Sequence, residues 1–356
     1  MSKIWVLGAG QLGAMLHYSS LPLGLDVQPI DIECGDSLNL GSHDVVTAER
    51  EKWPATLATD QLAAHPNFIN GAIFALLADR LTQKQKLDEL DIATSPWSPV
   101  SGDTTAKELH SNLVGEKVLL KQRTGGYDGR GQYWLDQNNN DEIPHDWLGE
   151  SIAEQKIPFE DEVSIVGVRN AQGEKVFYPL TLNLHIDGIL MGSLAPLNRV
   201  KHLQNQGETM LGKLMDGLDY VGVMAMECFR IGDQLMVNEV APRVHNSGHW
   251  TMAGANISQF EYHLRAIASL AIPQPVIKGQ TAMLNLIGTP YNAEWLDVSG
   301  AELYWYNKEV RPGRKLGHIN FTNSNKSALD SSLLNIEKQL PDNYAEVIGW
   351  LRTNLS

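Results

Sequence analysis

Cysteine is scarce in this sequence, with only Cys34 and Cys228 among 356 residues. Two cysteines are too few for a disulfide framework, and neither lies in a C-x-x-C or other metal-ligand spacing, so we expect two buried thiols. Long hydrophobic runs are also missing, because no apolar stretch reaches the roughly 18 residues that a membrane helix needs. Met1–Lys3 leads directly into a strand-like run, without the cationic leader of a signal peptide. These absences favour a cytoplasmic protein with no membrane partner.

Positive charge is scarce as well. The chain has 28 Lys and Arg against 42 Asp and Glu, a net charge of −14. Nucleic acids and anionic membranes would be repelled at long range, which argues against both as general partners. A small anion can still bind wherever cations gather locally. The hydrophobic share of 43% and charged share of 20% are ordinary for a folded protein, and the length predicts two or three domains.

The pattern of apolar residues changes along the chain. Over the first hundred residues it alternates, with a strand at Lys3–Leu7, a helix at Gln11–Ser19 and a strand at Asp26–Ile32, which predicts a parallel α/β sheet. The later part is an α+β arrangement rich in strands. The expected elements there include a strand at Lys175–Thr181, a hairpin of Val221–Ile231 and Gln234–Val240, and helices at Gln204–Leu218, Ile257–Leu270 and Tyr344–Leu355.

The first glycine loop, Gly8, Gly10 and Gly13, follows a strand, opens a helix and precedes Asp31. This is the fingerprint of a dinucleotide site, where glycines let the backbone approach a phosphate at a helix N-terminus. The same pattern fits an ordinary tight turn, or a loop that borders another ligand's site. The fingerprint alone therefore leaves an NAD(P)-dependent oxidoreductase as one alternative.

A second glycine loop carries more information. Thr124–Gln132 holds four glycines between two short strands, and Lys121 closes the strand before it. It is not a Walker A loop, because no Gly-Lys-Ser/Thr leads into a helix. Backbone N–H groups of such a flap can fold over phosphate oxygens, while Lys121 and Arg130 supply charge. We therefore predict a nucleotide-phosphate site here rather than an ordinary hairpin tip.

Glu227 and Glu239 each lie in an apolar strand, where an unpaired carboxylate is costly. Two carboxylates with the amide oxygen of Asn238 are oxygen ligands suited to Mg²⁺. A two-residue turn at Gly232–Asp233 would place Glu227 opposite Asn238 and turn Glu239 away. A joint metal site therefore requires an odd-numbered loop or a bulge in this hairpin.

These features together resemble the ATP-grasp superfamily, in which a lysine, a glycine flap, a hinge and a metal-binding Glu…Asn-Glu pair occur in this order. Within it, four motifs are similar to the N5-carboxyaminoimidazole ribonucleotide synthetase family over essentially the whole chain: Ala78–Lys84, Thr124–Gly131, Asn238–His249 and Tyr306–His318. The resemblance implies an ATP-grasp fold with an N-terminal Rossmann-like domain (1–100), a small subdomain with the flap (101–160) and a large subdomain with the metal site and a small C-terminal mixed unit (161–356). It also implies a homodimer.

The resemblance assigns roles to individual residues. The nucleotide site would comprise Arg80, Lys121, the flap residues Gly126, Tyr127, Asp128, Gly129, Arg130, Gly131 and Gln132, the hinge Glu154, Gln155, Lys156 and Ile157, and Glu162, His185, Asn238 and Glu239. Lys156 departs from the small residue expected in the hinge. Mg²⁺ would be held by Glu227 and Glu239. The catalytic residues would be Asp128, Arg243, His245 and Asn246, and the substrate phosphate would be held by Lys308, Arg311, Arg314 and Lys315.

The implied reaction joins bicarbonate to an amine at the expense of ATP in purine biosynthesis. ATP would phosphorylate bicarbonate to carboxyphosphate, and the exocyclic amine of 5-aminoimidazole ribonucleotide would capture its carboxyl group or CO₂ released from it. Other ATP-grasp ligases remain alternatives, such as a formate-dependent glycinamide ribonucleotide transformylase or a biotin carboxylase, as does a nucleotide-binding protein without catalysis. The stretches His245–His249 and Arg311–Lys315 argue against the other two ligases.

Overall fold

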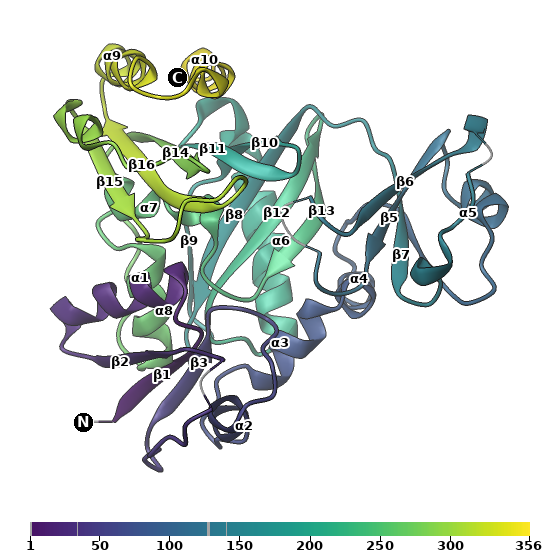
Figure 1. Cartoon of the computed structure of the whole chain (residues 1–356), viewed down its shortest axis with the longest axis horizontal. Helices are drawn as coiled ribbons and strands as arrows, with labels where there is room; N and C mark the ends of the chain where they lie inside the picture. The colour runs from purple at the N-terminus through teal and green to yellow at the C-terminus, as the bar shows by residue number, and fades with distance from the viewer. Residues whose placement is uncertain (1, 34, 127–128, 140) are drawn as a thin grey trace.

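The structure is a computed structural model that describes the chain except for residues 1, 34, 127–128 and 140. Its first part is a parallel sheet with the strand order β2 (Asp26–Ile30), β1 (Lys3–Leu7), β3 (Val45–Ala48). Helix α1 (Gln11–Ser20) connects β1 to β2, which confirms the predicted β–α–β unit (Figure 1). Three helices follow β3: α2 (Leu57–Ala63), α3 (Gly71–Ala78) and α4 (Arg80–Glu89).

A second, antiparallel sheet forms the lobe at the right of Figure 1. Its strand order is β4 (Trp97–Val100), β7 (Ser151–Gln155), β5 (Lys117–Gln122), β6 (Gln132–Asp136), and α5 (Ala106–Asn112) packs on it. This lobe has its own small core, which includes Val118, Leu120 and Leu135. The expected boundary at residue 100 falls after β4, although β4 already belongs to this sheet; the division into three domains stays a prediction.

The third sheet is the largest and is antiparallel throughout. Its strands run in the order β13 (Gln234–Ala241), β12 (Gly222–Ile231), β8 (Asp161–Arg169), β10 (Thr181–Ile186), β11 (Ile189–Ala195), β14 (Gln280–Ile287), β16 (Lys315–Asn323), β15 (Ala301–Trp305), and β9 (Lys175–Phe177) pairs with β8. The strands near the C-terminus therefore continue the sheet that carries the glutamate pair. The single strand expected at Lys175–Thr181 was wrong, because the chain leaves the sheet after Phe177 and enters β10 only at Thr181.

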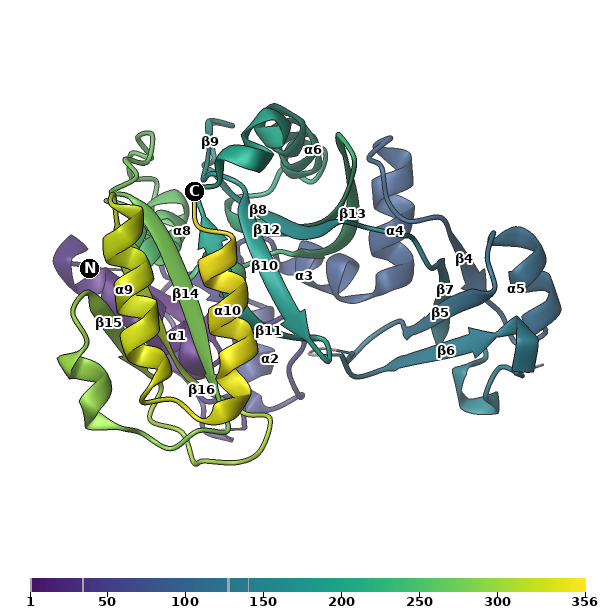
Figure 2. The same ribbon diagram turned by 90° about the horizontal axis from the view of Figure 1, so that it is seen from above.

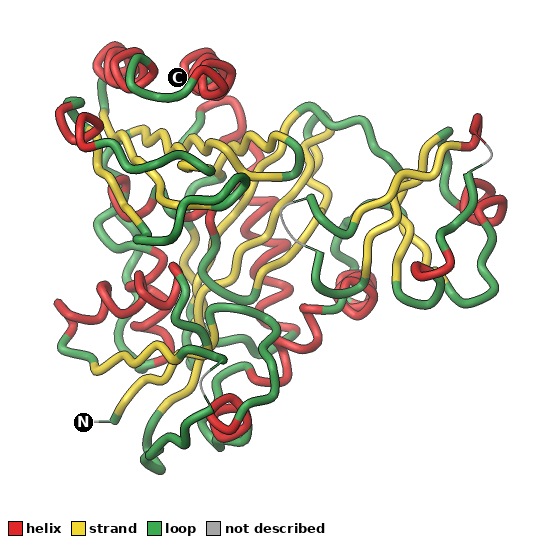
Figure 3. Tube along the Cα trace, viewed as in Figure 1, coloured by secondary structure: helices red, strands yellow, loops and turns green. Residues whose placement is uncertain are grey.

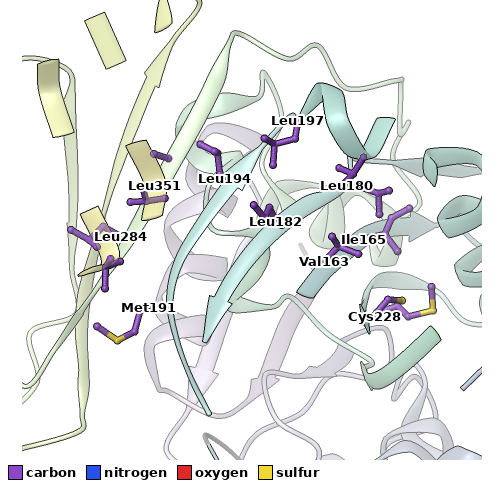
Figure 4. Close-up of a cluster of buried hydrophobic side chains, with 14 of the residues drawn as sticks. Val163, Ile165, Leu180, Leu182, Met191, Leu194, Leu197, Cys228, Leu284 and Leu351 are labelled. Atoms are coloured by element: carbon purple, nitrogen blue, oxygen red, sulfur yellow. The ribbon is translucent and has the colours of Figure 1, made fainter. Parts of the chain in front are cut away.

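Both faces of the large sheet are covered, and β8 shows how. Val163 and Ile165 point into one core with α6 (Gln204–Gly217), α9 (Lys326–Glu337) and α10 (Ala345–Thr353), while Val166 and Val168 face a second core with α1 and α8 (Gln259–Ile267). Figure 2 shows α9 and α10 side by side over the strands, and Figure 4 shows Leu182, Leu194 and Cys228 in the first core. Successive side chains of a strand point to opposite faces of the sheet, so a strand such as β8 contributes apolar side chains to both cores.

Two expectations about composition can be compared with this fold. Cys228 is a buried thiol, as predicted, and burial raises its pKa; Cys34 lies outside the described residues. In the part of the chain that is described, no helix combines the length and the apolar character needed to cross a membrane. The tube drawing in Figure 3 shows helices lying beside the strands of the large sheet.

The β12–β13 hairpin meets the register condition for a joint metal site. Its turn has two residues, because Ile231 pairs with Gln234. A bulge between Glu227 and Cys228 then shifts the pairing, so that Cys228 lies opposite Val237 and Glu227 opposite Glu239. An extra residue on one strand changes which side chains share a face. The bulge, rather than a longer loop, therefore brings the two glutamates to one side of the sheet.

His263 on α8 joins the first sheet to the large one. Its ring nitrogens contact Thr47 Oγ1 at 2.9 Å and the backbone N–H of Val223 at 3.1 Å. Burial lowers the pKa of His263 from 6.5 to about 4. The unfolded chain therefore binds more protons than the folded chain between these values, and stability must rise with pH across this window.

We expect His263→Gln to weaken this pH dependence. As the pH falls from 6.5 to about 5, His263 should lower the unfolding free energy of the wild-type protein by about 2 kcal/mol. The variant should not show this loss. Urea unfolding at a series of pH values measures the difference. The exposed His145→Gln should keep the native slope, and equal slopes for all three proteins would contradict the assignment.

Candidate active site

A cavity of about 1080 Å³ opens where the three sheets meet. Its wall includes residues from the first glycine loop, the flap, the hinge, the glutamate hairpin and the C-terminal strands. Of the predicted site residues, the wall contains Arg80, Lys121, Gly126, Gly129, Arg130, Gln132, Glu154, Gln155, Lys156, Ile157, Glu162, His185, Glu227, Asn238, Glu239, Arg243, His245, Asn246, Lys308 and Lys315. Residues far apart in the sequence thus share one cavity.

Lys121 is held in place by two partners. Its ammonium lies 2.8 Å from Glu154 Oε2 and donates to Asn238 Oδ1 at 2.9 Å. The other oxygen of Glu154 lies 2.9 Å from the ammonium of Lys84, which is 2% exposed. Burial opposes the charge on Glu154, but the two lysines outweigh it and lower the pKa of this carboxyl to about 2. A fixed ion triad therefore lies at the wall of the cavity, where the hinge strand meets Lys121.

Arg80 connects the flap to the glutamate hairpin. One guanidinium nitrogen donates to the carbonyl of Gln122 at 2.8 Å, and another donates to the carbonyl of Gly126 at 2.7 Å and lies 3.5 Å from Glu239. At the flap's other end, Gly129 has φ +75°, and a Cβ there would lie 2.5 Å from the carbonyl oxygen of Asp187. Glycine is thus required where the flap meets the turn after β10. Tyr127 and Asp128 lie outside the described residues.

The two glutamates differ in exposure. The side chain of Glu239 is 48% exposed, so it is not buried as we expected, whereas that of Glu227 is 19% exposed. Glu227 lies 3.9 Å from His185 Nε2 and 3.8 Å from His245 Nδ1, and its Oε1 has no hydrogen-bond partner. Burial raises the pKa of Glu227; His185 opposes the shift and Glu239 adds to it. An unpartnered oxygen beside a second carboxylate fits a cation site.

The side chains around Glu227 and Glu239 offer few ligands for a metal ion. Among the residues that the structure describes, no three His, Cys, Asp or Glu side chains gather as a metal site. Mg²⁺ commonly takes one or two carboxylates and completes its shell with water and phosphate oxygens. The glutamate pair fits that mode of binding.

Two histidines flank Glu227 in opposite electrostatic settings. His185 Nδ1 lies 2.6 Å from Glu162 Oε2. Burial opposes the charge on His185, but Glu162 and Glu227 overcome it and raise its pKa. Burial, followed by Arg243, holds the pKa of His245 well below 6.5. His245 is therefore neutral at pH 7, and its Nδ1 contacts Ser247 Oγ at 2.9 Å.

Arg243 and Asn246 already have partners. Arg243 Nε donates to Glu51 Oε1 at 2.9 Å. The amide of Asn246 exchanges two hydrogen bonds with that of Asn285, at 3.1 and 2.7 Å. These contacts fix both side chains at the cavity wall. The Asn246 amide at the wall is therefore already hydrogen-bonded to that of Asn285.

The predicted C-terminal cations do not all face the cavity. Lys308 donates to Gln11 Oε1 at 2.6 Å and lies 5.5 Å from the centre of the Tyr306 ring. Arg311 pairs with Glu309 at 2.5 Å, and Arg314 donates to the carbonyl of Glu309 at 3.3 Å. Arg311, Arg314 and Gly131 are absent from the wall formed by the described residues, unlike Lys308 and Lys315. Their binding roles stay predictions.

The first glycine loop is occupied by the protein itself. The Glu49 carboxylate accepts from the N–H of Gly10 at 2.6 Å and from that of Gly13 at 2.5 Å. These N–H groups lie at the start of α1, where a dinucleotide would place its phosphates. A carboxylate in that position repels a phosphate. The loop therefore borders the cavity without being a dinucleotide site.

Sequence reasoning missed Lys84, Glu49 and Glu51. Lys84 looked like one more polar residue of an amphipathic helix, although the motif Ala78–Lys84 ends on it. Glu49 and Glu51 follow the apolar run of β3, and a carboxylate at the end of a parallel strand was the available signal.

Comparisons with known proteins agree with this geometry. Residues 85–260 match the family model described as the ATP-grasp domain, and residues 281–332 match the phosphoribosylaminoimidazole carboxylase C-terminal domain. The N5-carboxyaminoimidazole ribonucleotide synthase of Haemophilus influenzae is 50% identical over 98% of this chain and 96% of its own length.

Two crystal structures have the same overall fold. That of N5-carboxyaminoimidazole ribonucleotide synthetase from Thermus thermophilus has a TM-score of 0.84 and 38% identity, covering 95% of this chain and 99% of the other. That of the Aspergillus clavatus N5-carboxyaminoimidazole synthase in complex with ADP and 5-aminoimidazole ribonucleotide has a TM-score of 0.80 and 26% identity, with the same coverage.

The lysine, the flap and the glutamate hairpin around one cavity define an ATP-grasp enzyme, a class of ATP-dependent ligases. Within this class, the chain belongs to the N5-carboxyaminoimidazole ribonucleotide synthase family.

The Glu49 contact predicts that NADH does not bind. We expect no saturable change in NADH fluorescence on titration with the protein, because the glycine-loop amides are already taken by a carboxylate. A fluorescent ADP analogue, added in the same buffer, serves as the positive control. Saturable NADH binding that survives an excess of ADP would restore the dinucleotide interpretation.

Proposed function

We propose that the protein uses ATP and bicarbonate to carboxylate the exocyclic amine of 5-aminoimidazole ribonucleotide, releasing ADP and phosphate in purine biosynthesis. The observation that carries this proposal is the shared cavity, whose wall includes Lys121, residues of the flap, Arg243, Lys308 and Lys315. The three anionic groups of the substrates are the ATP phosphates, bicarbonate and a ribose phosphate. Each of them can meet a cation in this cavity. Family membership supplies the identity of the substrates.

In the first step, a bicarbonate oxygen attacks the γ-phosphorus of ATP, the bond to ADP breaks, and carboxyphosphate forms. Lys121 and Arg80 would neutralise the phosphate oxygens, and the flap would exclude water from the unstable product. Arg243 and neutral His245 line the same cavity and would orient bicarbonate as cation and hydrogen-bond partner. The Glu51 contact keeps Arg243 in one position for that task.

In the second step, the substrate amine attacks the carboxyl carbon, either of carboxyphosphate or of CO₂ released from it, and phosphate leaves. Asp128 would orient the amine or accept its proton. Lys308 and Lys315 would hold the substrate's phosphate, with Arg311 and Arg314 able to join only if their loop changes its contacts with Glu309. Glu162 and His185 would meet the ribose side of the nucleotide, and the hinge Glu154–Ile157 its adenine.

Glu227 and Glu239 would hold Mg²⁺ together with phosphate oxygens of ATP. The support lies in their shared sheet face and in the unpartnered Oε1 of Glu227. The ion supplies charge neutralisation for the transferred phosphoryl group.

The homodimeric state and the cytoplasmic location are also parts of this proposal. Both rest on the family resemblance.

A coupled assay of ADP release tests the reaction. We expect turnover only when bicarbonate and 5-aminoimidazole ribonucleotide are both present, since the closed flap protects carboxyphosphate until the amine captures it. Each substrate is omitted in turn, and formate replaces bicarbonate in a control. Full ADP release without the amine, or turnover with formate, would contradict the proposal.

Glu239→Gln tests the metal assignment. The change keeps the size of the side chain but removes a charged ligand, so we expect turnover to fall by at least about 100-fold and the Mg²⁺ requirement to increase. Turnover is measured over a Mg²⁺ titration, and Glu89→Gln, an exposed glutamate that pairs with Lys86, is the control. Near-native turnover at native Mg²⁺ levels would remove Glu239 from the metal site.

A further inference from the structure

Lys84 is a buried cation that the proposed reaction does not use. Its side chain is 2% exposed, yet it lies on α4, in the second turn after Arg80. Its ammonium lies 2.9 Å from Glu154 Oε1 and donates to Thr94 Oγ1 at 2.5 Å. A buried ammonium is costly unless it is paired. This lysine therefore needs an explanation beyond helix packing.

The carboxylate it pairs with is shared. Glu154 gives one oxygen to Lys84 and the other to Lys121, at 2.9 and 2.8 Å. Lys84 and Lys121 supply two positive charges and Glu154 one negative charge, so the triad has a net charge of +1. Without Lys84 the pair Glu154–Lys121 would be neutral. The lysine that faces the nucleotide would then attract a phosphate far less.

We infer that Lys84 is a positioning residue that balances the charge of Glu154, so that the carboxylate holds Lys121 in place without neutralising its attraction for phosphate. This inference rests on the proposed function, in which Lys121 meets ATP phosphates. Lys84 itself does not line the cavity formed by the described residues. It acts through Glu154.

The surrounding contacts make the triad a rigid unit between two sheets. Thr94 Oγ1 donates to the carbonyl of Val237 at 2.7 Å, and the N–H of Val237 donates to the carbonyl of Ala93 at 2.8 Å. Lys121 reaches the same strand through Asn238. The hinge strand β7, the flap strand β5 and the hairpin strand β13 are thus joined around one buried carboxylate. Burial keeps this interaction strong and little affected by salt.

Charge balance makes a distinctive prediction for binding. Lys84→Met should weaken the binding of MgADP on the order of tenfold, which corresponds to about 1.4 kcal/mol. It should leave the affinity for adenosine unchanged. The double variant Lys84→Met/Glu154→Gln has only the charge of Lys121, again +1, and keeps a hydrogen-bonding side chain at the hinge, so it should bind MgADP more tightly than Lys84→Met does. A role in packing alone predicts equal losses for both ligands and no recovery.

The experiment measures the affinity for MgADP by calorimetry and the affinity for adenosine by ligand-observed NMR. Both are measured for the wild-type protein, the two variants and Lys86→Met. Lys86 is on the same helix and pairs with Glu89 at the surface, so its variant should bind as wild type does. If Lys84→Met does not fold, Glu154→Gln is compared with the double variant, and the single variant should bind MgADP about tenfold more tightly.

Each outcome decides the inference. Unchanged MgADP affinity in Lys84→Met, equal loss of adenosine and MgADP, or no recovery in the double variant overturns it. A wild-type protein that binds no MgADP, or that needs no bicarbonate for ADP release, overturns the proposed function instead.

Discussion

The buried carboxylate of Glu154 is the contact on which the site depends. It is 3% exposed, and two lysines from different elements compete with burial to keep it charged. A carboxylate in this position is unfavourable alone and favourable only with both cations. The small sheet, α4 and the glutamate hairpin must therefore come together for any one of these charges to be stable. The same ion triad thus links three parts of the fold and lies beside the cavity.

A second constraint is the register of the β12–β13 hairpin. A regular hairpin with its two-residue turn would place Glu227 and Glu239 on opposite faces. The bulge beside Glu227 corrects this by one residue. A local irregularity in the hydrogen bonding of the two strands thus places both glutamates on one face of the sheet. On this joint face, Glu239 is the more exposed of the two side chains and Glu227 the less exposed.

The first glycine loop illustrates how a familiar local pattern can serve a different end. Its glycines, strand and helix are those of a dinucleotide site, and the N–H groups do bind an anion. The anion is the carboxylate of Glu49, which ties β3 to α1 at the cavity wall. Glu51, two residues along, then reaches Arg243. The loop helps to arrange the cavity instead of holding a cofactor.

The sequence by itself determined much of this protein. Periodicity predicted the parallel first sheet and the paired strands of the hairpin, because both depend on alternation within one segment. Motif order led to the ATP-grasp class and family, and the hairpin arithmetic required a bulge or an odd-numbered loop. Only the tertiary structure decided that Lys84 shares a carboxylate with Lys121, that Glu49 fills the glycine loop, and that Arg311 and Arg314 turn toward Glu309. The first two contacts join residues distant in the chain, and packing between sheets sets their geometry. The contacts of Arg311 and Arg314 with Glu309 are local, but the conformation of their loop selects them and no periodic pattern does.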